Sequence, residues 1–427
     1  MSLKKKDYDN KLVLISSYLF LSIPVLLITG PFLSDLALSL ISIFFLIEVI
    51  KKKKIQYFKN IFFYVFFIFF IYLVLNSVFQ NQNFDSLKIS FGYLRFGIFC
   101  LAVVYILNFQ EKVLKKLFYV LFFTFLVLII DGFYQFFSGE NILGYPLSNG
   151  PRVSSLFNDE LILGSYLCRL FPVFFSMLIF FYKKISKTEY LLSCLIFILV
   201  EVLIFLSGER AAFFLMNLSS FFILIAIKSF KKLRFIILVI SLSIILIISL
   251  ALPNTKQRVF DQTFNQMHLF DNTKGMIIFS YEHDQLYKTA LNIYKDNILF
   301  GVGVKNFRNH CSEKKYKISE NSCNTHPHNT YIQLLAELGL VGLSFAIFVV
   351  YIFFKLSIRH ILSLFKKASY LTDFQVCLFS SILISIWPFI PTGNIFNNWL
   401  NIVYYYPVGI LLWSFQFKKK DFNFKQT

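Results

Sequence analysis

Two histidines and an amide stand close together in the stretch Thr325-His326-Pro327-His328-Asn329. An imidazole near its ordinary pKa can accept a proton at neutral pH, which suits general-base work on a hydroxyl group. A metal site is the weaker interpretation, because no other Cys/His pair stands at ligand spacing. The alternative is a purely structural role, in which Asn329 caps the start of a helix and both imidazoles are merely exposed.

A second polar group is the turn Ser207-Gly208-Glu209-Arg210, which separates two apolar runs. The planar fork of an arginine can hold a phosphate by paired hydrogen bonds, or it can simply extend toward lipid headgroups. Glu209 could also neutralise Arg210. Further cations expected on the same side of the protein are Arg152, Arg258, Lys305 and Arg308.

The elements that must position these groups are apolar. Of the 427 residues, 57% are hydrophobic and the mean hydropathy is +0.66, which leaves too little polar cover for a soluble protein of this size. The apolar runs predict an all-α polytopic membrane protein with about twelve transmembrane helices, since each run can cross a bilayer core of roughly 30 Å. We expect spans near residues 12–29, 33–50, 60–79, 89–108, 117–137, 160–182, 189–207, 211–227, 235–252, 333–354, 371–390 and 399–417.

The basic residues indicate the orientation, because cytoplasmic connections of membrane proteins carry an excess of lysine and arginine. They cluster in alternate connections, at residues 4–6, 51–54, 112–116, 183–187, 228–234, 355–367 and 418–420. With twelve spans, all these clusters and both termini are cytoplasmic. The net charge of +19 comes mostly from them, which argues against a nucleic-acid partner.

Charged side chains inside the expected spans are costly in lipid and should face the interior of the bundle. Those charges are Arg95, Asp131, Glu201 and Arg169. Asp131 and Gln135 stand one helical turn apart near the outer end of the fifth span.

One outward connection is too long for a simple connector. It covers residues 253–332, roughly 80 residues, within a single integral membrane domain of residues 1–427. Residues 284–297 inside it predict an amphipathic helix. Its apolar face would be formed by Leu286, Ala290, Ile293 and Tyr294.

Two of the six cysteines, Cys311 and Cys323, lie in this loop. In an oxidising compartment they could form a disulfide, and the alternative is two free thiols.

The spacing of His328-Asn329, then nine residues, then Gly339-x-x-Gly342 resembles the hallmark of the O-antigen ligase and O-antigen polymerase superfamily. The resemblance covers about residues 120–355. It extends to residues 131–135, 207–210 and 297–303, to Phe307, and to Glu337 before the tenth span.

This resemblance implies a GT-C type membrane glycosyltransferase, whose donor is a glycan on undecaprenyl pyrophosphate at the periplasmic face of the bacterial inner membrane. The residues matched to catalytic positions are His328, as the base, and Arg210, as the cation on the leaving pyrophosphate. His326 and Asn329 would complete the substrate-binding group. Neither a metal ion nor another cofactor is implied.

One family position differs. Many members carry an arginine in the large loop where this sequence has His283, and a Trp where it has Tyr287. His283 when protonated, or else Arg258 or Arg308, could supply the missing charge to the donor pyrophosphate.

Four functions remain open. The preferred one is an O-antigen ligase, which transfers the glycan to lipid A–core in lipopolysaccharide biosynthesis. An O-antigen polymerase would instead join lipid-linked repeat units. A protein O-oligosaccharyltransferase usually has a further periplasmic domain after the last span, whereas Thr427 follows that span closely. A transporter or flippase predicts inverted repeats and interrupted helices around midplane charges, which the sequence does not display, and gives no reason for the long loop.

Overall fold

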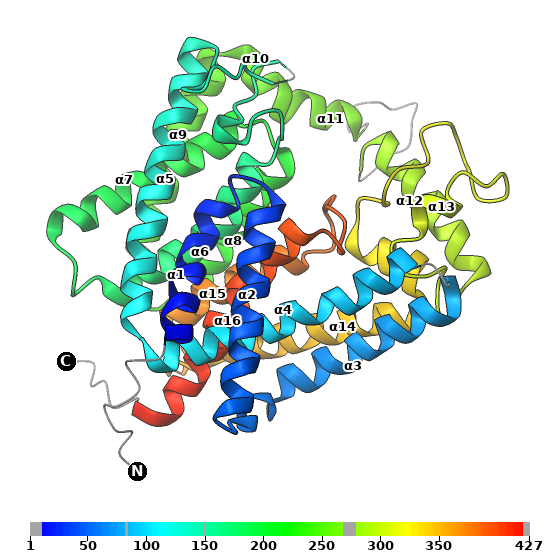
Figure 1. Ribbon diagram of the computed structural model, residues 1–427. Coiled ribbons are helices and arrows are strands. Elements are labelled where there is room, and N and C mark those ends of the chain that lie inside the picture. The colour runs from blue at the N-terminus through cyan, green and yellow to red at the C-terminus, as the bar shows by residue number, and fades with distance from the viewer. Residues whose placement is uncertain (1–10, 82–83, 149, 268–278, 367, 422–427) are drawn as a thin grey trace.

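The computed structural model describes residues 11–81, 84–148, 150–267, 279–366 and 368–421. The basic cluster expected at residues 4–6 lies outside them. The described chain is helical apart from connecting segments and isolated bridges, as the sequence predicts for an all-α protein. Figure 1 shows one bundle of long helices, with the loop elements α12 (Tyr281–Asp296) and α13 (Phe307–His310) beside it.

The described residues contain eight helices that are long and apolar enough to cross a membrane. They are α2 (Pro31–Lys51), α3 (Ile61–Asn76, continued to Gln80), α4 (Phe84–Phe109), α5 (Lys112–Ser138), α6 (Leu163–Phe181), α7 (Lys187–Leu206), α9 (Lys231–Ala251) and α14 (Thr330–Phe365). Three shorter apolar helices are α1 (Lys11–Leu26), α8 (Arg210–Ala226) and α15 (Asp373–Ile386), and the last helix is α16 (Asn398–Asp421). Every expected segment therefore coincides with a helix, and the protein is a polytopic membrane protein. That all twelve segments cross the membrane stays a prediction.

The centre of the bundle is α6, which is mostly apolar and almost entirely buried, its Arg169 included. It packs against α15, α7, α5 and α8, while α4 packs against α16 and α2. At the α4–α16 contact Gly409 allows close approach, since a Cβ there would lie 2.8 Å from Val103 Cβ. In contrast, α3 and α9 expose large apolar side chains, as expected for helices that face lipid.

Of the charges expected inside the bundle, Asp131, Arg169 and Glu201 are buried, and Arg95 is half-buried. Glu201 of α7 and Arg234 of α9 form an ion pair of 2.5 Å, and both side chains are almost fully buried. Arg95 of α4 pairs with Asp35 of α2 at 2.8 Å. Pairing of this kind offsets the cost of placing charge in an apolar surrounding.

The large loop contains helices α10 (Pro253–Lys256), η4 (Gln257–Asp261) and α11 (Gln262–Gln266), followed by α12 and α13. The amphipathic helix predicted at residues 284–297 is confirmed as α12, which buries Leu286, Ala290 and Ile293. A small apolar core between α12, α13 and the start of α14 includes Phe307 and Tyr316. The loop is thus a folded element with its own core.

A reciprocal glycine contact joins this loop to the bundle. Helix α14 is interrupted at Gly339, which has a φ of 64°, and Gly301 of the loop has a φ of 67°. A Cβ on either glycine would lie 2.3 Å from backbone atoms of the opposite segment, so no side chain fits at either position. Backbone hydrogen bonds run both ways, from Val302 N to Ala336 O (3.0 Å) and from Leu340 N to Ile298 O (2.9 Å). The break in α14 is therefore filled by the loop.

Candidate active site

Three imidazoles meet at the start of α14. The ring of His328 lies 4.0 Å from the ring of His326 and 5.6 Å from that of His283, measured between centroids. His283 comes from the first turn of α12, so the folded loop brings it to the two histidines that the sequence places together. We call His283, His326 and His328 the histidine cluster.

The backbone of His328 is held in an unusual conformation. Its φ is 57°, in the left-handed region that side chains other than Gly, Asn and Asp rarely adopt. Its carbonyl accepts hydrogen bonds from Thr392 N at 2.8 Å and from the Tyr287 hydroxyl at 3.4 Å. The segment before α16 and helix α12 together fix the direction of this imidazole.

Asn329 anchors the same turn. Its side-chain oxygen accepts from Tyr331 N and Ile332 N and so caps α14, as the sequence alternative proposed. Its Nδ2 donates to the carbonyls of Pro388 and Ile390. Because Asn329 is buried and its amide is engaged at both ends, the structure gives it a role in holding His328 rather than an open surface for substrate.

The tautomer of His328 follows from a neighbour that the sequence did not single out. Oδ1 of Asn324 accepts from Thr325 N, which turns Nδ2 of this amide toward Nε2 of His328 at 3.3 Å. Nδ2 can only donate, so Nε2 accepts, and a neutral ring carries its proton on Nδ1. His328 is partly exposed and Asn324 is exposed, so a substrate can reach this pair.

All three imidazoles are uncharged at neutral pH. Burial, together with the nearby His328, lowers the pKa of His326 to about 4, and burial, His328 and Arg210 lower the pKa of His283 to about 4. Burial also lowers the pKa of His328. A neutral imidazole is the form that accepts a proton. His283 is thus not a cation in the free protein, although a bound anion would raise its pKa.

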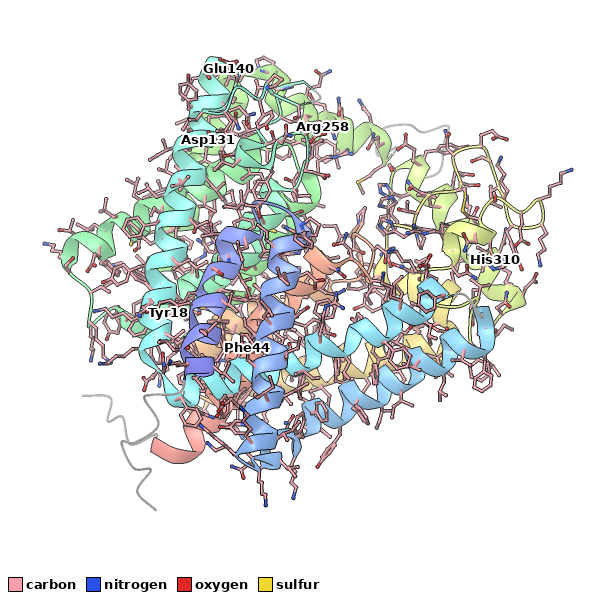
Figure 2. The ribbon with its side chains drawn as sticks, viewed as in Figure 1. Tyr18, Phe44, Asp131, Glu140, Arg258 and His310 are labelled. Atoms are coloured by element: carbon pink, nitrogen blue, oxygen red, sulfur yellow. A yellow bond between two sulfur atoms is a disulfide. The ribbon has the colours of Figure 1, made fainter. Side chains whose placement is uncertain are left out.

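Three arginines gather above the turn between α7 and α8. Arg152 and Arg258 both contact Gly208, where a Cβ would lie 3.0 Å from Cγ of Arg152 and 3.3 Å from Cγ of Arg258. Burial lowers the pKa of Arg152, and so do the positive charges of Arg258 and Arg210. We call Arg152, Arg210 and Arg258 the arginine cluster. Figure 2 shows Arg258 and Asp131 at the same end of the bundle.

Glu209 does not form an ion pair with Arg210. Its carboxylate accepts from Gly164 N at 2.6 Å and Ser165 N at 2.9 Å, at the start of α6. Arg210 instead donates to Gln266 at 2.8 Å and to Thr263 at 3.3 Å, both on the loop. Within the described chain, no carboxylate lies within 4.0 Å of the charged nitrogens of the arginine cluster.

The segment that carries Arg152 is held by two polar side chains of α5. Asp131 accepts from Ile142 N at 2.9 Å and from the Ser155 hydroxyl. Gln135 accepts from the backbone N–H groups of Ser154 and Ser155. The spacing of Asp131 and Gln135 therefore serves to position the outer connection, which explains why polar residues lie buried in this helix.

Residues 194–347 of the chain match the family model described as O-antigen ligase. The protein is a membrane protein with an O-antigen ligase family domain. Members of this family transfer glycans, and the family implies lipid-linked glycan substrates. No curated protein matches the chain.

The O-antigen ligase domain runs from α7 into the interrupted helix α14 and contains the histidine cluster, Arg210 and Arg258. The two clusters are neighbours, since the charge of Arg210 acts on His283. Arg152 joins from outside the matched range. Arg308 does not belong to the arginine cluster, because its guanidinium donates to the carbonyl of Thr325, beside His326.

The loop cysteines of the O-antigen ligase domain are joined in the structure. Cys311 and Cys323 form a disulfide with Cα atoms 5.0 Å apart. The bridge lies between Arg308 and Asn324, and therefore closes the segment that ends at the histidine cluster. Among the described residues of the chain, no group of three or more His, Cys, Asp or Glu side chains is arranged to hold a metal ion.

Sequence reasoning missed three partners of the histidine cluster. Asn324 bonds His328, the Ser280 hydroxyl lies 2.6 Å from Nδ1 of His283, and Thr392 holds the carbonyl of His328. Asn324 could have been suspected from its place four residues before His328. Ser280 and Thr392 carry no sequence signal that distinguishes them from other hydroxyl residues.

Proposed function

We propose that the protein is an O-antigen ligase, which transfers a glycan from undecaprenyl pyrophosphate to lipid A–core at the periplasmic face of the inner membrane. The observation that carries this proposal is the histidine cluster, with the pKa of His328 lowered by burial, linked through the action of Arg210 on His283 to three arginines that have no carboxylate partner in the described chain. The first can take a proton from a hydroxyl, and the second can hold a pyrophosphate. The periplasmic orientation follows from the basic clusters of the sequence.

The arginine cluster is the proposed site of the donor pyrophosphate. Three like charges so close together repel one another, and a bound dianion would relieve this repulsion. Arginine forks also match phosphate oxygens by paired hydrogen bonds. As the donor glycan leaves, negative charge grows on the pyrophosphate, and preorganised cations near it would stabilise the transition state.

His328 is the proposed general base. The acceptor hydroxyl would displace the amide of Asn324 from Nε2 and donate its proton to that atom. The acceptor oxygen then bonds to the anomeric carbon of the donor, while the bond from that carbon to the pyrophosphate oxygen breaks and its electron pair stays with undecaprenyl pyrophosphate. Attack from the side opposite the leaving group inverts the anomeric centre.

Arg258 is the proposed replacement for the family arginine that is absent at His283. It shares the Gly208 contact with Arg152, and its charge acts on Arg210. Nη1 of Arg258 donates to Gln262 at 2.7 Å, so its guanidinium is held by the loop. His283, which is uncharged in the free protein, would instead contact the bound donor as a neutral side chain or gain a proton when the pyrophosphate arrives.

The test is transfer by the purified full-length protein in lipid nanodiscs, supplied with an undecaprenyl-pyrophosphate-linked glycan. One reaction contains lipid A–core and a second contains only further lipid-linked donor. We expect the glycan on lipid A–core. Extension of the lipid-linked glycan, with no product on lipid A–core, would replace the ligase by the polymerase. A tag inserted near Ser319 that reports the cytoplasm would reject both.

A further inference from the structure

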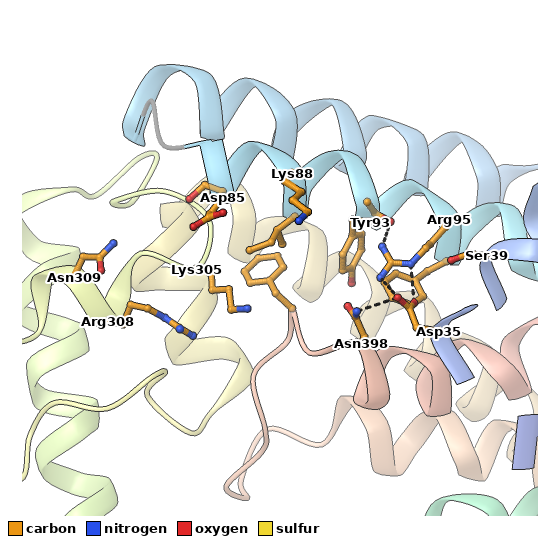
Figure 3. A pocket seen from close by; sticks show the side chains of 15 residues that line it. Asp35, Ser39, Asp85, Lys88, Tyr93, Arg95, Lys305, Arg308, Asn309 and Asn398 are labelled. Carbon is orange, nitrogen blue, oxygen red and sulfur yellow. Dashed lines mark hydrogen bonds and ion pairs between the residues drawn. The ribbon is translucent and has the colours of Figure 1, made fainter. Parts of the chain in front are cut away.

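A polar cavity of about 610 Å³, lined by residues outside the histidine and arginine clusters, has no part in the chemistry above (Figure 3). Its walls come from the first halves of α2 and α4, from α13 and the residue Lys305 before it, and from the start of α16 with the segment before it. This volume falls within the roughly 300–1,000 Å³ range of small-molecule sites in proteins.

Two walls of the cavity also hold the histidine cluster. Arg308 lines the cavity, and its Nη2 donates to the carbonyl of Thr325 at 3.3 Å, one residue before His326. Phe396 lines it from the segment whose Thr392 N–H binds the carbonyl of His328. The positive charge of Arg308 acts on His326, as that of Arg210 acts on His283. The arginine cluster and this cavity therefore each have a cation that acts on the histidine cluster.

The two ends of the cavity differ in charge. At one end Asp35 accepts from Arg95 at 2.8 and 3.1 Å and from Asn398 at 3.1 Å, which Figure 3 shows as a closed network. At the other end Lys88, Lys305 and Arg308 have no ion pair with any residue that the structure describes. Asp85 is the one lining carboxylate at that end, so positive charge is in excess.

We propose that this cavity binds the acceptor, and that it selects a glycan that carries a phosphate or carboxylate group near the attacking hydroxyl. The inference rests on the proposed transferase function and adds the substrate class of its second site. The three cations would hold the anionic group. The network of Asp35, Arg95 and Asn398 offers donors and acceptors to neutral sugar hydroxyls.

This placement gives the acceptor its own approach to His328. The donor pyrophosphate would lie at the arginine cluster and the acceptor in the cavity, with the base between them. Two separate anion sites of this kind keep two negatively charged substrates apart until the hydroxyl reaches the anomeric carbon.

The experiment measures binding without transfer. The full-length protein in phosphatidylcholine nanodiscs is treated with an amine-acetylating reagent, and the labelling of Lys88 and Lys305 is followed by mass spectrometry. The probes are glucose 6-phosphate, glucuronate and glucose. Lys314, which is exposed on the same loop outside the cavity, is the internal control.

We expect at least one anionic sugar to protect Lys88 and Lys305, but not Lys314, at about tenfold lower concentration than glucose, because charge-assisted hydrogen bonds are the stronger ones. Arg308→Gln should weaken this protection about tenfold, whereas Lys314→Gln should leave it unchanged. Equal protection by glucose, or protection by phosphatidylglycerol nanodiscs without any sugar, would overturn the inference. In the second case the cations would form a lipid-headgroup site.

The same variants separate this inference from the proposed function. In the transfer assay, Lys305→Gln with Arg308→Gln should raise KM for an acidic acceptor about tenfold and leave KM for the donor unchanged. Protection by anionic sugars in a protein without transferase activity would reject the proposed function alone. Transfer with equal KM for acidic acceptors and their dephosphorylated or carboxyl-reduced forms would reject the acceptor inference alone.

Discussion

The arginine in the ion pair Glu201–Arg234 has a carboxylate partner, whereas the arginines of the arginine cluster have none in the described chain. Arg234 is buried between α7 and α9, where the Glu201 carboxylate lies 2.5 Å from its guanidinium. Arg152, Arg210 and Arg258 lie at the end of the bundle that carries the large loop, and the nearby carboxylate of Glu209 is turned to the start of α6. The protein thus neutralises one arginine and leaves three with excess charge.

This difference separates Arg234 from the arginines proposed to bind the donor better than burial does. Arg152 is nearly as buried as Arg234, so exposure alone would group them together. What distinguishes them is whether the fold supplies the counter-charge. In the proposed function, the donor pyrophosphate would supply the counter-charge that the described fold does not give these arginines.

The largest effect is expected at the base. His328→Asn should lower kcat about 10²–10⁴-fold, which is the usual contribution of a general base. Asparagine tolerates the positive φ of this position, so the fold and the membrane level should be kept. His310→Asn is the matched control, since His310 belongs to the same loop and contacts Glu313 instead of the cluster. Transfer by His328→Asn at the wild-type rate would make the cluster structural.

The arginine cluster comes next. Arg210→Ala should lower kcat about 10²–10³-fold through the loss of one preorganised charge. Arg210→Lys should recover little of this, because a point charge does not reproduce a paired grip on phosphate. Arg258→Ala should act in the same direction. Arg359→Ala, which removes an arginine stacked on Tyr370, should keep full activity. Full activity of Arg258→Ala would contradict the replacement of the family arginine.

Substitutions in the buried pair Glu201–Arg234 should change the stability of the protein and not the rate of transfer. Glu201→Leu leaves Arg234 without its counter-charge and should lower the free energy of unfolding by about 3–5 kcal/mol. Glu201→Leu together with Arg234→Met should restore most of that loss, because neither charge remains. Thermal unfolding in nanodiscs measures both. If the double variant were as unstable as the single one, the pair would not be the source of the effect.

The loop disulfide should have a smaller effect. Replacing both Cys311 and Cys323 by Ser should lower the free energy of unfolding by about 3 kcal/mol, since the open chain gains conformational freedom. Mass spectrometry of non-reduced peptides from the wild type should recover the two residues as one cross-linked peptide. Recovery of both thiols free would reject the bridge.

The smallest expected effect on the rate is that of mild acid. Because the pKa of His328 is lowered below 6.5, kcat should fall no more than about twofold between pH 8 and pH 6.5, and should decline as the pH drops further. The free energy of unfolding should also fall as the pH falls. The folded protein keeps His283 and His326 neutral, with pKa values of about 4, whereas unfolded histidines gain a proton near pH 6.5. Unfolding should therefore become easier from about pH 6.5 down to 4, as measured by melting temperature. A rate that rises on acidification would reject a neutral base.

The helices of the bundle could be predicted because the thickness of a bilayer sets the length of each apolar run. The amphipathic pattern of α12 was equally readable, since Leu286, Ala290 and Ile293 recur at the helical period. The pairing of Glu201 with Arg234 could not be predicted from the sequence, because it depends on which helices become neighbours in the bundle. Sequence spacing identifies charges that must be buried and gives no partner for them.

The structure brings together His326, His328 and His283 of the predicted site, and adds neighbours that the sequence did not indicate. His328 and Arg210 stand in recognisable motifs, and the loop cations were named without their places. The structure then separates Arg258, which joins Arg210, from Arg308, which lines the cavity. Such assignments depend on the path of a long loop and of the segment before α16, and local sequence patterns do not fix either path.

The contact between Gly301 and Gly339 restricts how this chain can change over time. The obstacle to a side chain at either position is backbone of the other segment, so no smaller neighbour can be substituted to make room. Neither position can therefore vary through a compensating replacement at the other. In recombination between relatives, residues 297–303 and the start of α14 can be joined only where glycine stands at both positions, whereas the exposed residues between Cys311 and Cys323, unlike the buried Tyr316, face no such restriction. A chimera that brings any larger residue to either of these two positions should fail to assemble.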